Sequence, residues 1–346
     1  MARRSRMYML GAVFAAIQLW LPARVPAGTA ALESRSQPML HTFVEIKAWG
    51  SGARAAIDAA LDEMDRVNDL LNNYDPESEI SSINSSAGRG WTAVSPETLE
   101  VLQQAVHFGD ISGGAFDFTI GPLIKLWGFA RDNPGLEAGE PDPDDLKAAR
   151  NLVKYSDLQI RRQSGGSGRP GSVRLPRRGM WIDVGAFSKG YVADRAVRVL
   201  RSRGIANALV VAGGTVCAFG VKPDDSAWRI GIRHPRREGS FLTIITLKDQ
   251  TVSTSGDYEK YYKKNGRRRT HIIDPRTGTP VETMQAVTVI APEGVTSDAL
   301  STALFVLGPG DGMALVERLN GVEALLVTQE GNVLFSSGWP QKQVVY

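Results

Sequence analysis

The sequence predicts an α+β protein that folds as one compact unit with two lobes of mixed sheet and flanking helices. Some segments place apolar residues at the helical period and others alternate apolar with polar residues, yet the two kinds do not alternate strictly along the chain. The chain has 346 residues, of which 42% are hydrophobic and 22% are charged. This is an ordinary globular composition, and the length suits one large domain.

The first thirty residues have the pattern of an export signal. Three arginines within the first six residues precede an apolar run over residues 7–21, and the small residues of 27–30 follow. The run is short for a bilayer span, although an N-terminal anchor that is retained stays open as an alternative. We therefore expect residues 1–30 to be a signal peptide and the mature protein to be exported.

Removal of this signal changes the charge of the chain. The formal net charge is +3, and the first thirty residues contain four arginines and no acid, so the remainder carries −1. A nucleic-acid-binding function therefore loses its main support. Because Cys217 is the single cysteine, no internal disulfide can form. Stability must come from burial of a core, which a chain of this length can supply.

Helices are expected where apolar residues recur every three to four positions between capping or breaking residues. Ser95 and Pro96 form a typical helix start, and Gly204 is a typical helix end. The expected helices span residues 53–71, 96–111, 188–203, 295–307 and 313–319.

Strands are expected where apolar residues alternate with polar ones, or form short runs bounded by turn residues. The expected strands span residues 40–48, 180–184, 208–212, 228–233, 242–247, 284–290, 322–328 and 333–336. Residues 131–145 are rich in Pro, Gly and acids, which favours a surface loop. Residues 163–171 are rich in Gly and Ser and favour the tip of a hairpin.

Asp298 and Thr302 lie four residues apart in an expected helix, so their oxygens should point to the same side. Such oxygens suit Mg²⁺, which takes few protein ligands and shares its other positions with substrate phosphates. His271 follows an expected strand and could transfer a proton or bind a phosphate. Asp274 could orient His271 or only start the turn at Pro275, and we favour the turn. Together these residues indicate metal-assisted phosphoryl chemistry.

Residues 183–191 join an expected strand to an expected helix. Gly185 would let the backbone approach a ligand closely, and the free amides of a helix start favour an anion. Lys189 would add a positive charge for a phosphate, and the carbonyl of Ala186 could bind a hard metal ion. The alternative is an ordinary capped turn, in which Asp183 serves only the backbone.

Three further segments have both a functional and a structural interpretation. Residues 114–122 surround Asp117 with small and aromatic residues, which fits either a ring-binding pocket or a turn with two core phenylalanines. Tyr74 follows a helix and could lie against a flat heterocycle or serve as a cap. Residues 260–269 are strongly basic, and we favour a solvated hairpin tip over nucleic-acid binding.

In their order along the chain, these segments resemble the ApbE family of FAD:protein FMN transferases. The resemblance covers residues 38–340, and it implies one domain with its active site in the cleft between the two lobes. The matching motifs are Tyr74 with Ser78–Glu79 and Ser82–Asn84, Gly114–Pro122, Leu126–Phe129, Asp183–Tyr191, Gly213–Gly214, Ser255–Tyr258, His271–Gly278 with Pro280, and Asp298–Thr302 with Leu304–Gly308.

The resemblance implies an enzyme that splits the pyrophosphate of FAD, moves FMN onto a Thr or Ser hydroxyl of an exported flavoprotein and releases AMP. It implies that Mg²⁺ is required and is held by Asp298, Thr302, the Ala186 carbonyl and Ser301. His271 would act in the catalytic step. The residues that would contact FAD are Leu40, Tyr74, Ala115, Phe116, Asp117, Asp183, Lys189 and Ile272.

The chain departs from the family pattern at a few positions. Ser301 stands where many members have Asp, which removes a charge from the implied metal site. Thr215 stands where Asn is frequent, and Ala186-Phe187 where many have Gly-Ile.

Two other functions stay open at this point. Water could replace the acceptor hydroxyl, giving a Mg²⁺-dependent FAD pyrophosphatase, or the protein could be an exported FAD-binding accessory without turnover. The expected partners are FAD and an acceptor flavoprotein, with no nucleic acid. The expected location is the periplasm, where the protein could touch the inner membrane.

Overall fold

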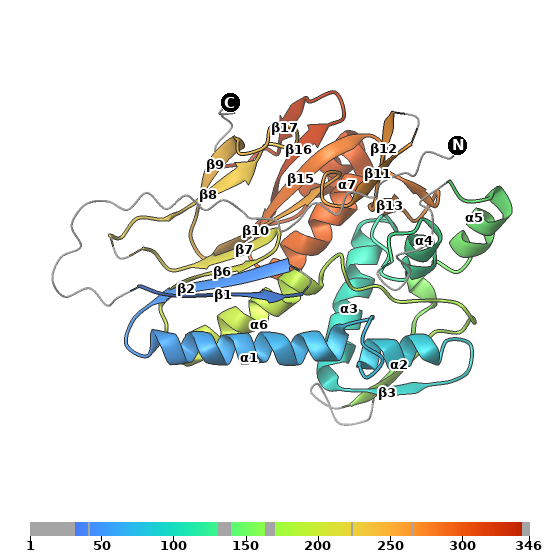
Figure 1. Cartoon of the computed structure of the whole chain (residues 1–346), viewed down its shortest axis with the longest axis horizontal. Helices are drawn as coiled ribbons and strands as arrows, with labels where there is room; N and C mark the ends of the chain where they lie inside the picture. Colours follow the sequence, from blue (N-terminus) through green and yellow to red (C-terminus); the bar gives the residue numbers. More distant parts are fainter. Residues whose placement is uncertain are drawn as a thin grey trace, which may run out of the picture.

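The structure is a computed structural model that describes residues 32–40, 42–130, 140–162, 170–222, 224–264 and 266–340. The expected signal peptide and most of the two expected loops, at 131–139 and 163–169, lie outside the described residues. The predicted α+β class is confirmed: helices pack on a large sheet (Figure 1).

An eight-stranded sheet forms the centre of the fold, in the order β1-β2-β6-β7-β10-β15-β16-β17. Its strands are β1 (Leu32–Met39), β2 (Thr42–Trp49), β6 (Asn207–Ala212), β7 (Thr215–Phe219), β10 (Gln250–Gly256), β15 (Met284–Ala291), β16 (Glu323–Thr328) and β17 (Val333–Phe335). Every ladder between the described strands is antiparallel, so the sheet is not mixed in strand direction.

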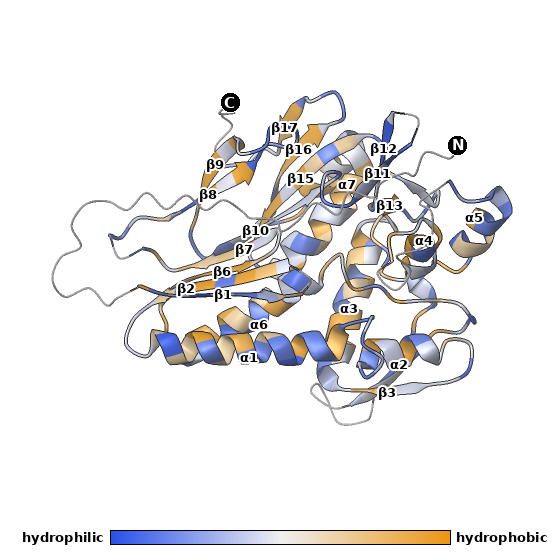
Figure 2. Ribbon diagram, viewed as in Figure 1, coloured by the Kyte–Doolittle hydropathy of each residue, from blue (hydrophilic) through white to orange (hydrophobic). Residues whose placement is uncertain are grey.

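Both faces of this sheet are buried, and the alternation of side chains explains how. In β6, Ala208 and Val210 face the main core, whereas Leu209 and Val211 face a second core. Three helices cover the main core: α1 (Ala53–Leu71), α6 (Ser188–Ser202) and α7 (Gly294–Val316). The hairpin of β8 (Trp228–Arg233) and β9 (Phe241–Leu247) covers the second. Figure 2 shows the resulting contrast along α1, which has apolar residues on one side and polar residues on the other.

The remaining elements lie at one end of the sheet (Figure 1). The helices are α2 (Glu79–Ser85), α3 (Pro96–Ile111), α4 (Gly121–Leu126), α5 (Pro143–Arg150) and the 3₁₀ turn η1 (Tyr155–Asp157). A small sheet has the order β3-β5-β4, with β3 (Thr92–Val94), β4 (Gln159–Arg162) and β5 (Gly171–Arg174). Two hairpins complete this part: β11 (Tyr261–Lys264) with β12 (Arg267–Thr270), and β13 (Ile273–Asp274) with β14 (Thr279–Pro280).

Helix α7 combines the two helices expected at 295–307 and 313–319. Its path breaks at Gly308, which has φ 76° and ψ −172°, and Pro309 follows. Proline cannot continue the hydrogen-bond ladder of the preceding turn, so the break falls where the sequence expected a boundary. Among the described residues, α7 alone is long and apolar enough to cross a membrane, and most of its residues are buried inside the protein.

The structure differs from the expected elements in several places. Residues 180–184 form no strand, because Trp181 makes only an isolated bridge to Ile120. The last three residues of the loop expected at 131–145 instead begin α5; this helix buries no residue, and the Asp142 side chain accepts a hydrogen bond from Asp144 N to cap it. The first strand β1 was missed because its residues are mostly polar and exposed, as an edge strand allows.

Candidate active site

The start of α6 and the start of α7 cross in direct backbone contact. A Cβ added to Gly190 would lie 2.1 Å from the Gly294 carbonyl oxygen, and one added to Gly294 would lie 2.6 Å from the Gly190 carbonyl oxygen. Two glycines are therefore what allows the helices to approach this closely. The crossing brings Asp298, on the second turn of α7, against the first turn of α6.

Asp298 is bound by two groups of α6. Its Oδ2 accepts a hydrogen bond of 2.9 Å from Gly190 N, and its Oδ1 lies 3.4 Å from Lys189 Nζ. The side chain is only 5% exposed, and this burial raises the pKa of the carboxyl while Lys189 opposes the rise. Lys189 Nζ also donates to the Gly185 carbonyl at 2.9 Å. A positive charge thus already lies between a carbonyl oxygen of the 183–187 turn and the carboxylate of α7.

This donor set fits Mg²⁺ better than a transition metal. The described residues contain no group of three His, Cys, Asp or Glu side chains that could hold a metal ion, which argues against a zinc-type centre. The oxygens that converge on the Lys189 ammonium come instead from a carbonyl and a single carboxylate. Mg²⁺ prefers such hard oxygen ligands and fills its other positions with water and phosphate. The Ala186 carbonyl, one residue beyond Gly185, remains a predicted ligand.

Ser301 and Thr302 both contact the same strand residue. Ser301 Oγ lies 2.7 Å from Ser255 Oγ on β10, and Thr302 Oγ1 lies 3.3 Å from it. Ser301 Oγ also donates to the Asp298 carbonyl at 2.8 Å, and Ser301 is fully buried. Ser255 belongs to one of the family motifs found in the sequence, but no function was predicted for it.

His271 lies directly after β12 with its ring fixed by one carbonyl. Its backbone amide donates to the Lys260 carbonyl at 3.0 Å, and its ring Nδ1 lies 3.1 Å from the same oxygen. Since a carbonyl can only accept, Nδ1 carries the proton and Nε2 keeps a free lone pair. Burial, and secondarily Lys260, lowers the pKa of His271 to about 3. The imidazole is therefore neutral at physiological pH.

Asp274 serves the turn and not His271. Its Oδ1 accepts from Arg276 N at 2.8 Å, its carbonyl accepts from Gly278 N at 2.7 Å, and its carboxylate pairs with the Arg276 side chain. The favoured interpretation of this residue is confirmed. The group that orients His271 is the Lys260 carbonyl, which no spacing in the sequence could indicate.

Lys189, Lys260, Asp183 and His271 share one electrostatic environment. Both lysines lower the pKa of Asp183, although burial raises it overall, and both lower the pKa of His271. Asp183 Oδ1 accepts from Gly185 N at 2.8 Å, so it also shapes the turn that holds Lys189. Lys189 thus links the 183–189 turn to Asp298 by an ion pair and to His271 by its charge.

The 115–117 loop is held mainly by its own packing. Asp117 accepts hydrogen bonds from Thr119 N (2.8 Å), Thr119 Oγ1 (2.6 Å) and Tyr155 N (2.9 Å). Phe116 is buried between Phe108 and Phe187, with ring centroids 5.9 and 5.7 Å apart, and Ala115 is also buried. A ligand would therefore meet backbone groups of this loop more readily than its side chains. Contact with FAD here stays a prediction.

The other predicted FAD contacts lie in turns. Leu40 has φ 53° in the connection between β1 and β2. Tyr74 follows α1, and its amide donates to Asn72 Oδ1 at 3.1 Å. Ile272 is buried, and its carbonyl accepts from Val281 N at 2.9 Å. None of these contacts tests a flavin-binding role, so all three remain predictions.

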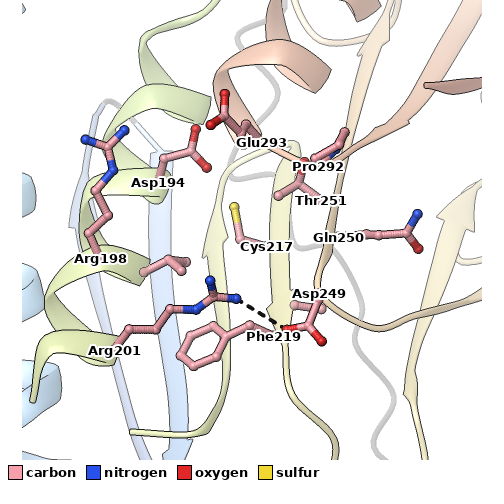
Figure 3. Close-up of a pocket in the computed structure, with 12 residues that line it drawn as sticks. Asp194, Arg198, Arg201, Cys217, Phe219, Asp249, Gln250, Thr251, Pro292 and Glu293 are labelled. Carbon is pink, nitrogen blue, oxygen red and sulfur yellow. Dashed lines mark hydrogen bonds and ion pairs between the residues drawn. The ribbon is translucent and has the colours of Figure 1, made fainter. Parts of the chain in front are cut away.

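A separate pocket of about 140 Å³ lies beside α6 (Figure 3). None of the predicted site residues lines it. Its Asp194 points to the start of α7, where Oδ1 accepts from Gly294 N at 2.7 Å and Oδ2 from Val295 N at 2.9 Å. Asp194, which lines this pocket, therefore caps the start of α7. We do not assign the pocket to the reaction.

Comparisons with known proteins identify the family of the chain. The sequence model of the ApbE family matches residues 40–326. A relative from Treponema pallidum named FAD:protein FMN transferase is 34% identical over 320 residues, covering 88% of this chain and 87% of its own. A relative of the same name from Escherichia coli K12 is 30% identical and covers 84% of this chain and 85% of its own.

Comparison with solved structures points to the same family. The apo flavinyl transferase ApbE of Pseudomonas stutzeri superposes with a TM-score of 0.79 at 30% identity, covering 90% of this chain and 97% of its own. The ApbE protein of Thermotoga maritima also has a TM-score of 0.79, at 32% identity, covering 89% and 98%. With the family model matching well over half of its length, this chain belongs to the ApbE family.

Proposed function

We propose that this protein transfers FMN from FAD to a Thr or Ser hydroxyl of an exported flavoprotein, with Mg²⁺, and releases AMP. The observation that carries the proposal is the ion pair of Lys189 with Asp298, in a site where Lys189 and Lys260 also help to lower the pKa of a neutral His271. The relatives named FAD:protein FMN transferase support the coarser statement that it is a flavin transferase.

The reaction needs one bond to form and one to break at the same phosphorus. The acceptor hydroxyl oxygen attacks the FMN-side phosphorus in line, and the bond from that phosphorus to the bridging oxygen breaks as AMP leaves. The proton of the hydroxyl passes to Nε2 of His271, whose Nδ1 is already committed to the Lys260 carbonyl. A product with a phosphoester bond results.

Charge on the phosphoryl oxygens would be stabilised by groups that the fold holds in place. Lys189 supplies a cation beside the proposed ligand Asp298. Asp298 and Thr302 would hold Mg²⁺, together with the predicted Ala186 carbonyl. When bound, this ion neutralises the pyrophosphate and stabilises the leaving group.

One experiment separates transfer from the two alternatives. The purified protein is incubated with FAD, Mg²⁺ and an acceptor domain that bears a Thr, and the acceptor is then denatured. Fluorescent flavin that stays on the acceptor, with one AMP released per flavin, supports transfer. Free FMN and AMP without labelled acceptor would make the protein a pyrophosphatase. Intact bound FAD would make it a binding accessory.

The location is a proposal of its own, and it rests on the signal-like residues 1–30. We propose that the mature protein works in the periplasm, where an acceptor in or on the inner membrane would bring it to that surface. Cell fractionation with N-terminal sequencing of the mature chain tests this. A protein recovered from the cytoplasm with residues 1–30 intact would contradict it.

A further inference from the structure

Hydroxyl groups join β10 to α7 in a regular ladder. Ser253 Oγ lies 2.7 Å from Ser297 Oγ, and Thr251 Oγ1 donates to the same oxygen at 3.2 Å. Two residues along the strand and four along the helix, Ser255 contacts Ser301. Two strand residues span about 6.8 Å and four helix residues about 6 Å, so the two series stay in register.

The last pair of the ladder carries an additional contact to Thr302. Ser255 Oγ lies 2.7 Å from Ser301 Oγ and 3.3 Å from Thr302 Oγ1, and Ser301 Oγ donates to the Asp298 carbonyl at 2.8 Å. Each hydroxyl has one proton to donate. Since Ser301 has given its proton to the carbonyl, Ser255 must donate to Ser301, and Ser255 is then free to accept from Thr302.

The direction of these hydrogen bonds is therefore fixed: Thr302 to Ser255, Ser255 to Ser301, Ser301 to the Asp298 carbonyl. A neutral hydroxyl binds a cation through a lone pair, with its proton directed away from the ion. These three hydrogen bonds, here called the relay, meet this requirement for Thr302, whose lone pairs are left unused. Ser301 is fully buried and already both donates and accepts.

We propose that Ser255 is a positioning residue for the divalent cation site, which accepts the Thr302 proton so that Thr302 presents its lone pairs to the ion. Ser301 acts in this arrangement through Ser255, as the anchor of the relay. The inference rests on the proposed function, because that function supplies the cation.

Binding of Mn²⁺, which reports directly by electron paramagnetic resonance, tests the proposal without catalysis. Loss of a group that orients a metal ligand typically weakens metal binding about 10–100-fold, so we expect at least about a tenfold weaker Mn²⁺ affinity for Ser255→Ala. Ser255→Thr keeps a hydroxyl and should restore most of this loss. FAD affinity measured without metal should not change.

Ser253→Ala is the matched control, since it removes the neighbouring hydroxyl pair of the same ladder without touching Thr302. It should lower the stability at least as much as Ser255→Ala, since Ser253 is more buried and also contacts Thr215, yet leave Mn²⁺ affinity unchanged. Equal weakening in both variants would mean general loosening of α7 and would overturn the proposal. Wild-type affinity in Ser255→Ala would overturn it as well.

A double-mutant cycle on Mn²⁺ affinity tests the role of Ser301. If Ser301 acts through Ser255, the Mn²⁺ affinity of the double variant Ser255→Ala with Ser301→Ala should match that of Ser255→Ala alone. Additive losses would mean that Ser301 touches the ion itself, contrary to the relay. These outcomes are independent of the transfer assay: a wild-type protein that binds Mn²⁺ but labels no acceptor refutes the proposed function only.

Discussion

At the scale of single residues, Asp298 and Lys189 depend on each other. The carboxylate is almost fully buried, and its charge is balanced by the ammonium 3.4 Å away and by the Gly190 amide. A buried charge that loses its partner is costly, so neither residue can be replaced without effect on the other.

Asp298→Ala should abolish Mg²⁺-dependent turnover, because the one carboxylate among the proposed ligands is lost. The rate of AMP release from FAD at saturating Mg²⁺ measures this. Asp311→Ala is the control, since Asp311 is an exposed acid near the far end of the same helix. Turnover near the wild-type rate in the Asp298 variant would refute the metal assignment.

His271→Ala should slow the chemical step by about 10²–10⁴-fold while FAD affinity stays close to that of the wild type. The exposed His107 supplies a control substitution, His107→Ala. Single-turnover rates and flavin fluorescence titrations separate the two effects. If the His271 variant fails to bind FAD, this histidine is a structural residue.

The lowered pKa of His271 also predicts the pH dependence of the wild-type rate. A folded-state pKa of about 3 keeps the ring neutral and able to accept a proton throughout the range in which a free histidine would become charged. The single-turnover rate should therefore not decline between pH 7 and pH 5.5 through protonation of this group. A decline with an apparent pKa near 6.5 would contradict the lowered pKa of His271.

At the scale of elements, the crossing of α6 and α7 sets the position of the site. Gly190→Ala would place a methyl group 2.1 Å from the Gly294 carbonyl oxygen, so the helices would have to separate. We expect a loss of about 1–3 kcal/mol or more in the free energy of unfolding, measured in urea. Gly310→Ala, where an added Cβ meets nothing within 4 Å, should cost nothing. Equal losses of unfolding free energy in the two variants would show that a methyl group at residue 190 meets no steric clash.

The cap of α7 by Asp194 should make stability depend on pH. Burial raises the pKa of this carboxyl to about 6, while the two amide hydrogen bonds to it oppose the rise. The folded state then holds the proton more tightly than the unfolded chain, whose pKa is near 3.8. The contribution of Asp194 to stability must therefore fall as the pH rises from about 4 to 6.

Comparison of wild type with Asp194→Asn isolates this contribution. The amide keeps one acceptor oxygen for the helix start but does not titrate. The free energy of unfolding of the wild type, relative to the variant, should fall between pH 4 and pH 6 and be constant above pH 7. A difference that is constant from pH 4 to pH 7 would refute the raised pKa.

The elements that the sequence predicted are those with a local cause. Helix α1 begins and ends where it was expected, because its apolar residues keep the helical period until Asn72 follows. Helix α3 was recognisable from Ser95, whose side chain accepts from Thr98 N. Helix α5 was missed because it buries no residue, so no apolar period marks it.

The site was predictable only in part, for the same reason. The spacing of Asp298 and Thr302 is local, and the helix that carries them was expected. The bond from Gly190 N to Asp298, the Lys260 carbonyl on His271 and the Ser255 relay join residues 11 to 108 positions apart. Such contacts depend on how elements pack, and one sequence contains no pattern that specifies them.

At the scale of the whole molecule, the proposed site joins parts that are otherwise distant in the chain. Helices α6 and α7 belong to the layer that covers the main core, whereas His271 belongs to the hairpins at the end of the sheet. A ligand that contacts both should stabilise the folded protein as a unit, because it binds the native state only.

FAD together with Mg²⁺ should therefore raise the thermal midpoint more than the sum of the two separate shifts. Binding at a concentration one hundred times the dissociation constant adds about 2.7 kcal/mol to the stability. Differential scanning fluorimetry of a hydrolysis-resistant FAD analogue measures this, with Asp298→Ala as the control that should lose the synergy. Simple additivity in the wild type would place metal and nucleotide at independent sites.

The close approach of Gly190 and Gly294 has a consequence for how this protein can change over time. The close separation of the two helices requires the absence of two methyl groups. A sequence can drift freely at many buried positions if volume is compensated nearby. Here no neighbour can compensate, so bare backbone at both positions is the feature that descendants of this chain must inherit unchanged.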